Sequence, residues 1–124
     1  MVKVLVIEDD PSLRLLWRVG LEVHGMRVIE ACDGVTGLEL ARREQPDVIT
    51  LDVMLPWIDG WGVARRLRED SATRDIPIVF LTARAGPDDR QRGLELGAVD
   101  YITVPINPTE LPQAIEAVLE RRSS

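Results

Sequence analysis

The chain contains little that would tie it to a membrane or to an oxidising compartment. Its 124 residues include one cysteine, Cys32, which excludes an internal disulfide bond and favours a reducing cytosol. No apolar run approaches the about 18 residues that a membrane span needs, and the N-terminus lacks the apolar region and cleavage site of a signal peptide. We therefore expect a cytoplasmic protein without a membrane partner.

Positive charge is also scarce. The chain has 15 Lys and Arg against 21 Asp and Glu, so its formal net charge is −6. Binding along a phosphate backbone uses clustered Lys and Arg, and we therefore expect no direct nucleic-acid binding. A composition of 45% hydrophobic and 29% charged residues is ordinary for a globular protein, and the length fits one domain over residues 1–124.

Short apolar runs alternate with longer amphipathic stretches along the chain, which predicts strands alternating with helices. The last helix can begin at Pro108 or at Pro112, because a proline inside a helix removes a backbone hydrogen bond. We predict strands over Lys3–Ile7, Arg27–Ala31, Asp47–Leu51, Ile76–Leu81 and Asp100–Thr103, and helices over Pro11–His24, Gly34–Glu44, Gly60–Arg68, Pro87–Leu96 and Pro108–Arg121.

Strands that are each followed by a helix predict an α/β fold: a single doubly wound, five-stranded parallel sheet with helices on both faces. Among the common strand orders, the flavodoxin-like order 2-1-3-4-5 fits a domain this short. It places the first and third strands side by side, and ligands of such sheets bind beyond the carboxyl ends of the strands at that point. The predicted helices use the whole chain and leave no residues for an output domain.

Carboxylates follow the first and third predicted strands. Glu8, Asp9 and Asp10 end the first strand, and Asp52 ends the third. Neighbouring carboxylates resist joint ionisation unless a cation or protons intervene. Carboxylate oxygens suit a hard cation such as Mg²⁺, and Asp52 could then act as a nucleophile toward a phosphoryl group. Thr82, at the end of the fourth strand, offers a hydroxyl to a phosphoryl oxygen. Loop capping explains any one aspartate more readily than the joint pattern.

Several short motifs, each weak alone, occur in a specific order and spacing. They are Val6-Ile7-Glu8-Asp9-Asp10-Pro11, Leu51-Asp52-Val53-Met54-Leu55-Pro56, Asp59-Gly60, Leu81-Thr82-Ala83, Gly97-Ala98-Val99-Asp100-Tyr101 and Pro105. With these motifs the chain resembles, over essentially its whole length, a response-regulator receiver domain of bacterial two-component signalling.

The resemblance implies a magnesium site and a phosphoacceptor. Glu8 and Asp9 would form the acidic pair that binds Mg²⁺ with Asp52, and the backbone carbonyl of Met54 would complete the protein ligands. Asp52 would accept a phosphoryl group from the phosphohistidine of a sensor histidine kinase or phosphotransfer protein. Such a domain is not an enzyme beyond the self-catalysed phosphorylation and dephosphorylation of its own aspartate.

The resemblance also implies a switch. Thr82 and Tyr101 would be the switch pair, with the tyrosine ring turning inward after phosphorylation. The face built from the fourth helix, fifth strand and fifth helix would carry the signal to a protein effector or a tethered output domain, and the same face offers a route to a homodimer.

One residue departs from the family pattern. The family has a lysine directly before the proline that follows the fifth strand, and this chain has Val104 there. That lysine normally pairs with the phosphoryl group, so we predict that phosphate-driven switching is impaired while the pocket still binds Mg²⁺. Arg84 is a candidate for the missing cation. The family's bond before this proline is typically cis, and Val104-Pro105 can keep this geometry.

Three other functions remain open at this stage. A degenerate receiver would keep the fold and act as a constitutive interaction module, and Val104 favours it. A flavodoxin-type cofactor binder needs a phosphate-cradling loop after the first strand, where the acidic run Glu8-Asp9-Asp10 would repel phosphate. A magnesium phosphatase with an aspartyl intermediate would want a second aspartate two residues after Asp52, where Met54 stands.

Two tryptophans and the cysteine allow further predictions. Trp57 and Trp61 flank Asp59-Gly60 in the segment after Asp52, where they suit either partner docking or local packing. Cys32 has no nearby base in the sequence and is predicted to be a small packing residue.

Overall fold

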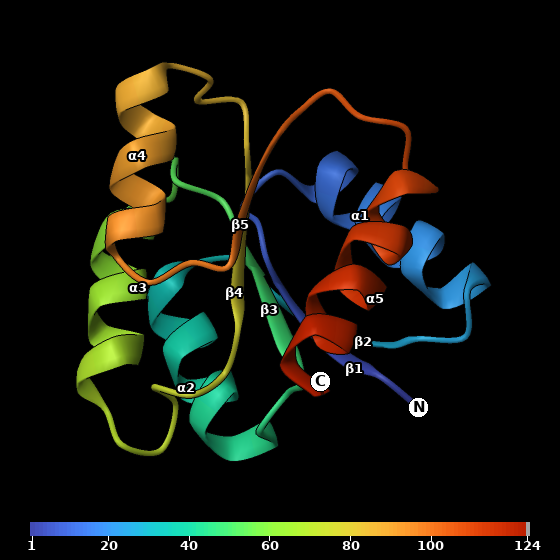
Figure 1. Ribbon diagram of the computed structural model, residues 1–124, viewed down its shortest axis with the longest axis horizontal. Helices are drawn as coiled ribbons and strands as arrows, with labels where there is room; N and C mark the ends of the chain where they lie inside the picture. Colours follow the sequence, from blue (N-terminus) through green and yellow to red (C-terminus); the bar gives the residue numbers. More distant parts are fainter. Residues whose placement is uncertain (124) are drawn as a thin grey trace.

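The computed structural model describes residues 1–123, so Ser124, the last residue of the predicted domain, lies outside it. Five strands and five helices alternate along these residues, and all four strand pairings are parallel, in the order β2-β1-β3-β4-β5 (Figure 1). The predicted fold class and strand order are confirmed. The elements are β1 Lys3–Ile7, α1 Pro11–Val23, β2 Arg27–Ala31, α2 Gly34–Glu44, β3 Val48–Leu51, α3 Gly60–Glu69, β4 Ile78–Thr82, α4 Pro87–Glu95, β5 Asp100–Thr103 and α5 Glu110–Ser123.

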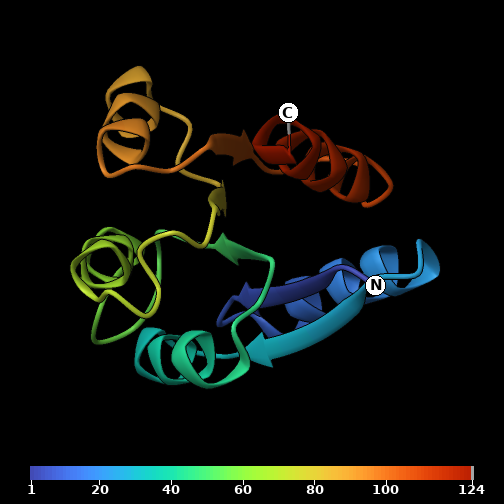
Figure 2. The same ribbon diagram turned by 60° about the horizontal axis from the view of Figure 1, so that its bottom comes forward.

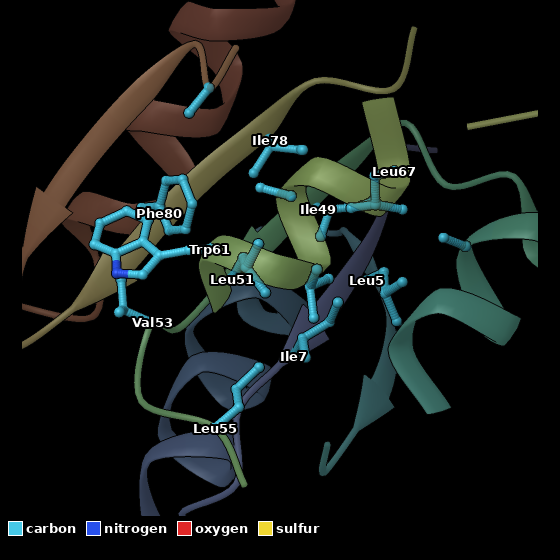
Figure 3. Packing of buried hydrophobic residues seen from close by; sticks show 14 of the residues in the cluster. Leu5, Ile7, Ile49, Leu51, Val53, Leu55, Trp61, Leu67, Ile78 and Phe80 are labelled. Atoms are coloured by element: carbon cyan, nitrogen blue, oxygen red, sulfur yellow. The ribbon is translucent and has the colours of Figure 1, made fainter. Parts of the chain in front are cut away.

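The sheet is covered on both faces. Helices α1 and α5 lie on one face, and α2, α3 and α4 lie on the other (Figures 1 and 2). Because successive strand residues point to opposite faces, the apolar runs supply two cores. Leu5, Ile7, Ile49, Leu51, Ile78 and Phe80 pack toward α2, α3 and α4 (Figure 3), and Val4, Val6, Val48, Val79 and Leu81 pack toward α1 and α5.

Two elements begin two residues away from their predicted starts, whereas the other predicted starts lie within one residue of the observed ones. β4 begins two residues later than expected, because the N–H of Ile76 donates to the carbonyl of Thr73 in the preceding turn (3.0 Å). The last helix begins at Glu110, between the two predicted starts. Asn107 Oδ1 accepts a hydrogen bond from the N–H of Thr109 (3.0 Å), and Pro112 falls in the first helical turn, where its missing N–H costs nothing.

Aspartates begin the three helices that follow β1, β2 and β3. Asp10 accepts hydrogen bonds from the N–H groups of Ser12 and Leu13, Asp33 from that of Thr36, and Asp59 from that of Gly62. Each aspartate satisfies donors that the first helical turn leaves without a partner. The turns from strand to helix are therefore held firmly at the edge where the acidic residues gather.

Within residues 1–123, the helices lack the length and hydropathy that a membrane crossing requires.

Candidate magnesium and phosphoacceptor site

The carboxylates of Glu8, Asp9 and Asp52 meet at the carboxyl ends of β1 and β3. One oxygen of each residue lies within 4.8 Å of an oxygen of each of the others. β1 and β3 are paired, with Ile7 opposite Leu51, so the residues that follow both strands emerge at the same edge. The N–H of Asp52 also donates to the carbonyl of Ile7 (3.2 Å), which holds the first residue after β3 against β1.

A tight loop after β3 shapes the other side of this pocket. The N–H of Met54 donates to Asp52 Oδ1 (3.2 Å), and the N–H of Gly60 donates to the carbonyl of Val53 (2.8 Å). A Cβ atom on Gly60 would overlap the carbonyl oxygen of Asp52. The glycine of the Asp59-Gly60 motif is therefore required because α3 begins in contact with the backbone of Asp52 and Val53.

The three acids differ in their environments. Glu8 is buried, with 3% of its surface exposed, whereas Asp9 is exposed. The pKa of the Glu8 carboxyl is raised to about 8, mainly by burial and also by the neighbouring charge of Asp52, although a hydrogen bond from the N–H of Asp10 (3.1 Å) opposes the rise. At neutral pH the cation-free pocket therefore carries a proton on Glu8, which a bound cation would displace.

The donor set fits a hard divalent cation. Three carboxylate oxygens close together are the kind of ligand that Mg²⁺ takes from proteins, together with water. Glu8, Asp9 and Asp52 would hold the ion. The N–H of Met54 holds its backbone beside Asp52, and the carbonyl of Met54 stays a predicted ligand.

The predicted switch residues lie on β4 and β5, and both are buried. The N–H of Arg84 donates to Thr82 Oγ1 (3.3 Å), and the hydroxyl of Tyr101 donates to the carbonyl of Arg84 (2.7 Å). Both side chains therefore bind the backbone of Arg84, the second residue after β4. Burial raises the pKa of the Tyr101 hydroxyl, which keeps it protonated and able to donate.

An aromatic cluster holds the Tyr101 ring in this inward position. The ring of Trp61 stacks on that of Tyr101, with centroids 6.4 Å apart at 17°, and Phe80 lies 5.1 Å from Trp61 (Figure 3). A Cβ atom on Gly93 would lie 2.7 Å from Tyr101 Cδ2, so only glycine lets α4 approach so closely. The guanidinium of Arg92 lies 4.8 Å from the centroid of the Trp61 ring.

The two tryptophans near the pocket have different environments. Trp61 is 3% exposed, which confirms local packing for this residue. Trp57 is 85% exposed and has a φ of 65°, a left-handed backbone conformation that residues other than glycine seldom adopt. Its proposed role in partner docking stays a prediction. The prediction for Cys32 is wrong: the residue is exposed, because it follows the edge strand β2 in the turn before α2.

Val104 and Arg84 occupy well-defined places. The N–H of Val104 donates to the carbonyl of Thr82 (2.9 Å), and its side chain packs against the core beneath α1 and α5. The bond between Val104 and Pro105 is cis, the geometry that is typical of the family and that this pair was expected to allow. Arg84 is exposed, and its Nη2 lies 3.0 Å from Asp89 Oδ1, a pairing that raises the pKa of the guanidinium. This ion pair directs Arg84 toward the start of α4, and its role as a replacement cation stays a prediction.

Sequence reasoning missed Arg14. Its guanidinium donates to the carbonyl of Glu8 (2.9 Å), one of the three acids of the carboxylate pocket. A long side chain on a helix points back toward the N-terminus and covers the preceding turn. An arginine in the first turns of a helix that follows an acidic loop was therefore a signal available in the sequence.

A carboxylate pocket at the switch point of a 2-1-3-4-5 parallel sheet, with Thr82 and Tyr101 on the next two strands, defines a doubly wound α/β domain with a candidate cation site. Residues 4–116 match the model of the response regulator receiver domain, and the chain belongs to this family.

Relatives and solved structures agree with this assignment. The chain is 45% identical over 119 residues to a probable transcriptional regulator ycf27 of Porphyridium aerugineum, covering 96% of the chain and 48% of the relative. It is 43% identical over 121 residues to the DNA-binding dual master transcriptional regulator RpaA of Synechocystis sp., covering 98% and 50%. The receiver domain of a sensor histidine kinase from Pseudomonas aeruginosa, solved with a magnesium ion coordinated in its active site cleft, has a TM-score of 0.88 at 31% identity, covering 96% and 98%.

The prediction about nucleic acid needs correction. The chain spans about half the length of these curated relatives, which are transcriptional regulators, one of them named as DNA-binding. The expectation of no nucleic-acid partner is therefore wrong for the group to which the chain is similar. Its physical basis was too narrow, because a net charge of −6 describes only the 124 residues counted. In a longer regulator another part can carry the basic surface.

Proposed function

We propose that this receiver accepts a phosphoryl group on Asp52 from the phosphohistidine of a sensor kinase or phosphotransfer protein. The observation that carries the proposal is the meeting of the Glu8, Asp9 and Asp52 carboxylates within 4.8 Å in a chain of this family. An Asp52 oxygen forms a bond to phosphorus as the bond from phosphorus to the histidine nitrogen breaks. The electron pair of the broken bond stays on the imidazole, which takes up a proton.

Each neighbouring group has a part in this proposal. Bound Mg²⁺ would neutralise the charge on the phosphoryl oxygens. Asp52 is partly accessible, which suits attack on a donor held by another protein. The hydroxyl of Thr82, now an acceptor for the N–H of Arg84, would donate to a phosphoryl oxygen. Glu8 would lose its proton as the cation enters.

Modification by acetyl phosphate in the presence of Mg²⁺ tests the proposal. We expect intact-mass spectrometry to detect one added phosphoryl group on the natural chain and none on Asp52→Asn. Asp59→Asn is a matched control, because asparagine also caps a helix and should keep both α3 and the modification. Equal labelling of Asp52→Asn, or no labelling of the natural chain with donor and Mg²⁺ in excess, would refute the assignment.

We further propose that phosphorylation is weakly coupled to the switch. Val104 supplies no cation to a phosphoryl group, and the inward ring of Tyr101 rests on Trp61, Gly93 and the carbonyl of Arg84. These contacts do not depend on a charge at Asp52. Beryllium fluoride with Mg²⁺ should therefore change Trp61 fluorescence only slightly in a chain carrying Trp17→Phe and Trp57→Phe. A large saturable change would indicate normal switching.

The same packing favours a second candidate function, a receiver that binds its effector without phosphorylation. Effector affinity separates the two functions. Under the first, Asp52→Asn weakens effector binding after treatment with the phosphodonor; under the second, the natural chain and Asp52→Asn bind equally well with or without the donor.

Exposed apolar side chains support docking of the phosphodonor protein near the pocket. Trp57 and Met54 are 85% and 59% exposed in the loop after β3. Helix α1, which begins beside the pocket, also exposes Leu15, Leu16, Val19 and Val23.

We propose that the α4–β5–α5 face carries the signal to an effector, a tethered output domain or a second copy of the chain. The names of the relatives support transcriptional control as the output, and a cytoplasmic location stays a prediction.

A further inference from the structure

Arg14 links three segments, one of which carries two acids of the carboxylate pocket. Its Nη1 donates to the carbonyls of Glu8 (2.9 Å) and Asp9 (3.5 Å). Its Nε lies 3.3 Å from Glu30 Oε1 on β2. The guanidinium therefore joins helix α1, the loop after β1 and the neighbouring strand β2, and only 21% of the side chain is exposed.

These contacts act on the segment that carries two of the three acids. The β1 ladder ends at Ile7, so the carbonyls of Glu8 and Asp9 lie beyond the regular sheet. A planar guanidinium has donors on fixed sides and can bind a carbonyl and a carboxylate together. Its contacts limit rotation of the backbone at Glu8 and Asp9, and this rotation sets the directions of their side chains toward Asp52.

The role of Arg14 is distinct from that of a free cation. Its charge is matched by Glu30, which also binds Arg18 Nη1 at 3.0 Å, and its other donor reaches backbone carbonyls rather than the carboxylates of the pocket. We propose that Arg14 is a positioning residue that orients the carboxylates of Glu8 and Asp9 for the cation. This inference rests on the proposed function, because it assigns a support to the same magnesium site.

The test compares Arg14→Lys, Arg14→Gln and Arg18→Gln. Lysine keeps the charge but lacks the fork that reaches two segments. Arg18 shares the Glu30 partner, and its ion pairs within residues 1–123 are with Glu30 and Glu22. Removing a group that supports metal ligands typically weakens metal binding by 10–100-fold, so we expect roughly tenfold weaker Mg²⁺ binding for both Arg14 variants. Arg18→Gln should bind Mg²⁺ like the natural chain. Calorimetry gives the affinities, and thermal melting in EDTA confirms folding.

A second measurement works without metal. The N–H of Asp10 is held by Glu8 Oε2 (3.1 Å), so its hydrogen exchange reports on the order of the acidic loop. We expect faster exchange in Arg14→Lys and an unchanged rate in Arg18→Gln. The inference is overturned if Arg14→Lys keeps both the Mg²⁺ affinity and the Asp10 exchange rate of the natural chain. If Arg14→Lys keeps the natural Mg²⁺ affinity and only Arg14→Gln binds Mg²⁺ more weakly, the effect belongs to the charge of Arg14 and the positioning role is wrong. No Mg²⁺ binding by the natural chain would refute the proposed function instead, while the exchange rates would still decide the role of Arg14.

Discussion

Magnesium binding should release a proton from Glu8. Burial raises the pKa of this carboxyl to about 8, so about nine-tenths of cation-free molecules carry the proton at about pH 7. A cation binds the ionised carboxylate, and each ion should therefore displace about 0.9 proton at that pH. Below about pH 8, the apparent affinity for Mg²⁺ should rise about tenfold for each unit by which the pH increases, and above about pH 8 it should level off.

The same proton determines how the stability of the cation-free protein depends on pH. The pKa of Glu8 in the folded state is above its unfolded value of about 4.3, so the folded protein binds more protons between these two values. The resulting stabilisation is fully present below about pH 4 and is lost as the pH rises toward about 8. In EDTA the melting temperature should fall as the pH rises through this window. At the alkaline end, Mg²⁺ should restore most of the lost melting temperature.

Calorimetry at about pH 7 in two buffers with different ionisation enthalpies measures the released proton directly. Glu8→Gln should abolish the buffer dependence and flatten the change of melting temperature with pH. Glu22→Gln is a control for the loss of one negative charge, because Glu22 is exposed and pairs with Arg18. The reasoning is refuted if Mg²⁺ binds the natural chain while releasing less than about 0.2 proton, or if Glu8→Gln keeps the natural pH dependence.

Three substitutions test the neighbouring features. Val104→Lys adds a cation worth about 1–4 kcal/mol at roughly 4 Å, and should speed labelling of Asp52 by acetyl phosphate relative to Val104→Met; equal rates would count against a charge effect. Trp61→Leu removes buried contacts with Tyr101 and should lower the free energy of unfolding, measured in urea, by about 2–4 kcal/mol. A decrease of less than about 1 kcal/mol would show that the aromatic cluster contributes little to stability. Trp57→Ala should leave stability unchanged and slow phosphotransfer from a kinase; an unchanged rate would exclude docking there.

The periodicity of apolar residues was enough to predict the sheet and its layers, because each strand in a covered parallel sheet must be apolar on both faces. Boundaries were harder, since they depend on single hydrogen bonds. The N–H of Ile76 binds a turn carbonyl, and Asn107 binds the N–H of Thr109 before the last helix. Such local competition leaves no trace in the pattern of hydrophobic residues.

Strand order explains why the meeting of Glu8, Asp9 and Asp52 could be expected from the sequence. Exposure could not be deduced in the same way. Trp57 and Trp61 are four positions apart, yet one is exposed and the other lies under α4, because the first precedes α3 and the second faces Phe80 from within it. The side of an element on which a residue falls depends on where the helix begins.

The charge balance of the pocket connects Val104 with Glu8. No lysine stands before Pro105, and the buried Glu8 carboxyl of the pocket holds a proton at neutral pH. A lysine would be a fixed charge, whereas this proton departs when a cation enters or the pH rises. We therefore predict that labelling of Asp52 depends more steeply on pH in this chain than in a variant with lysine. The pH profile of Asp52 labelling should therefore flatten in Val104→Lys, and the pKa of Glu8 should fall, because the added cation favours the ionised carboxylate.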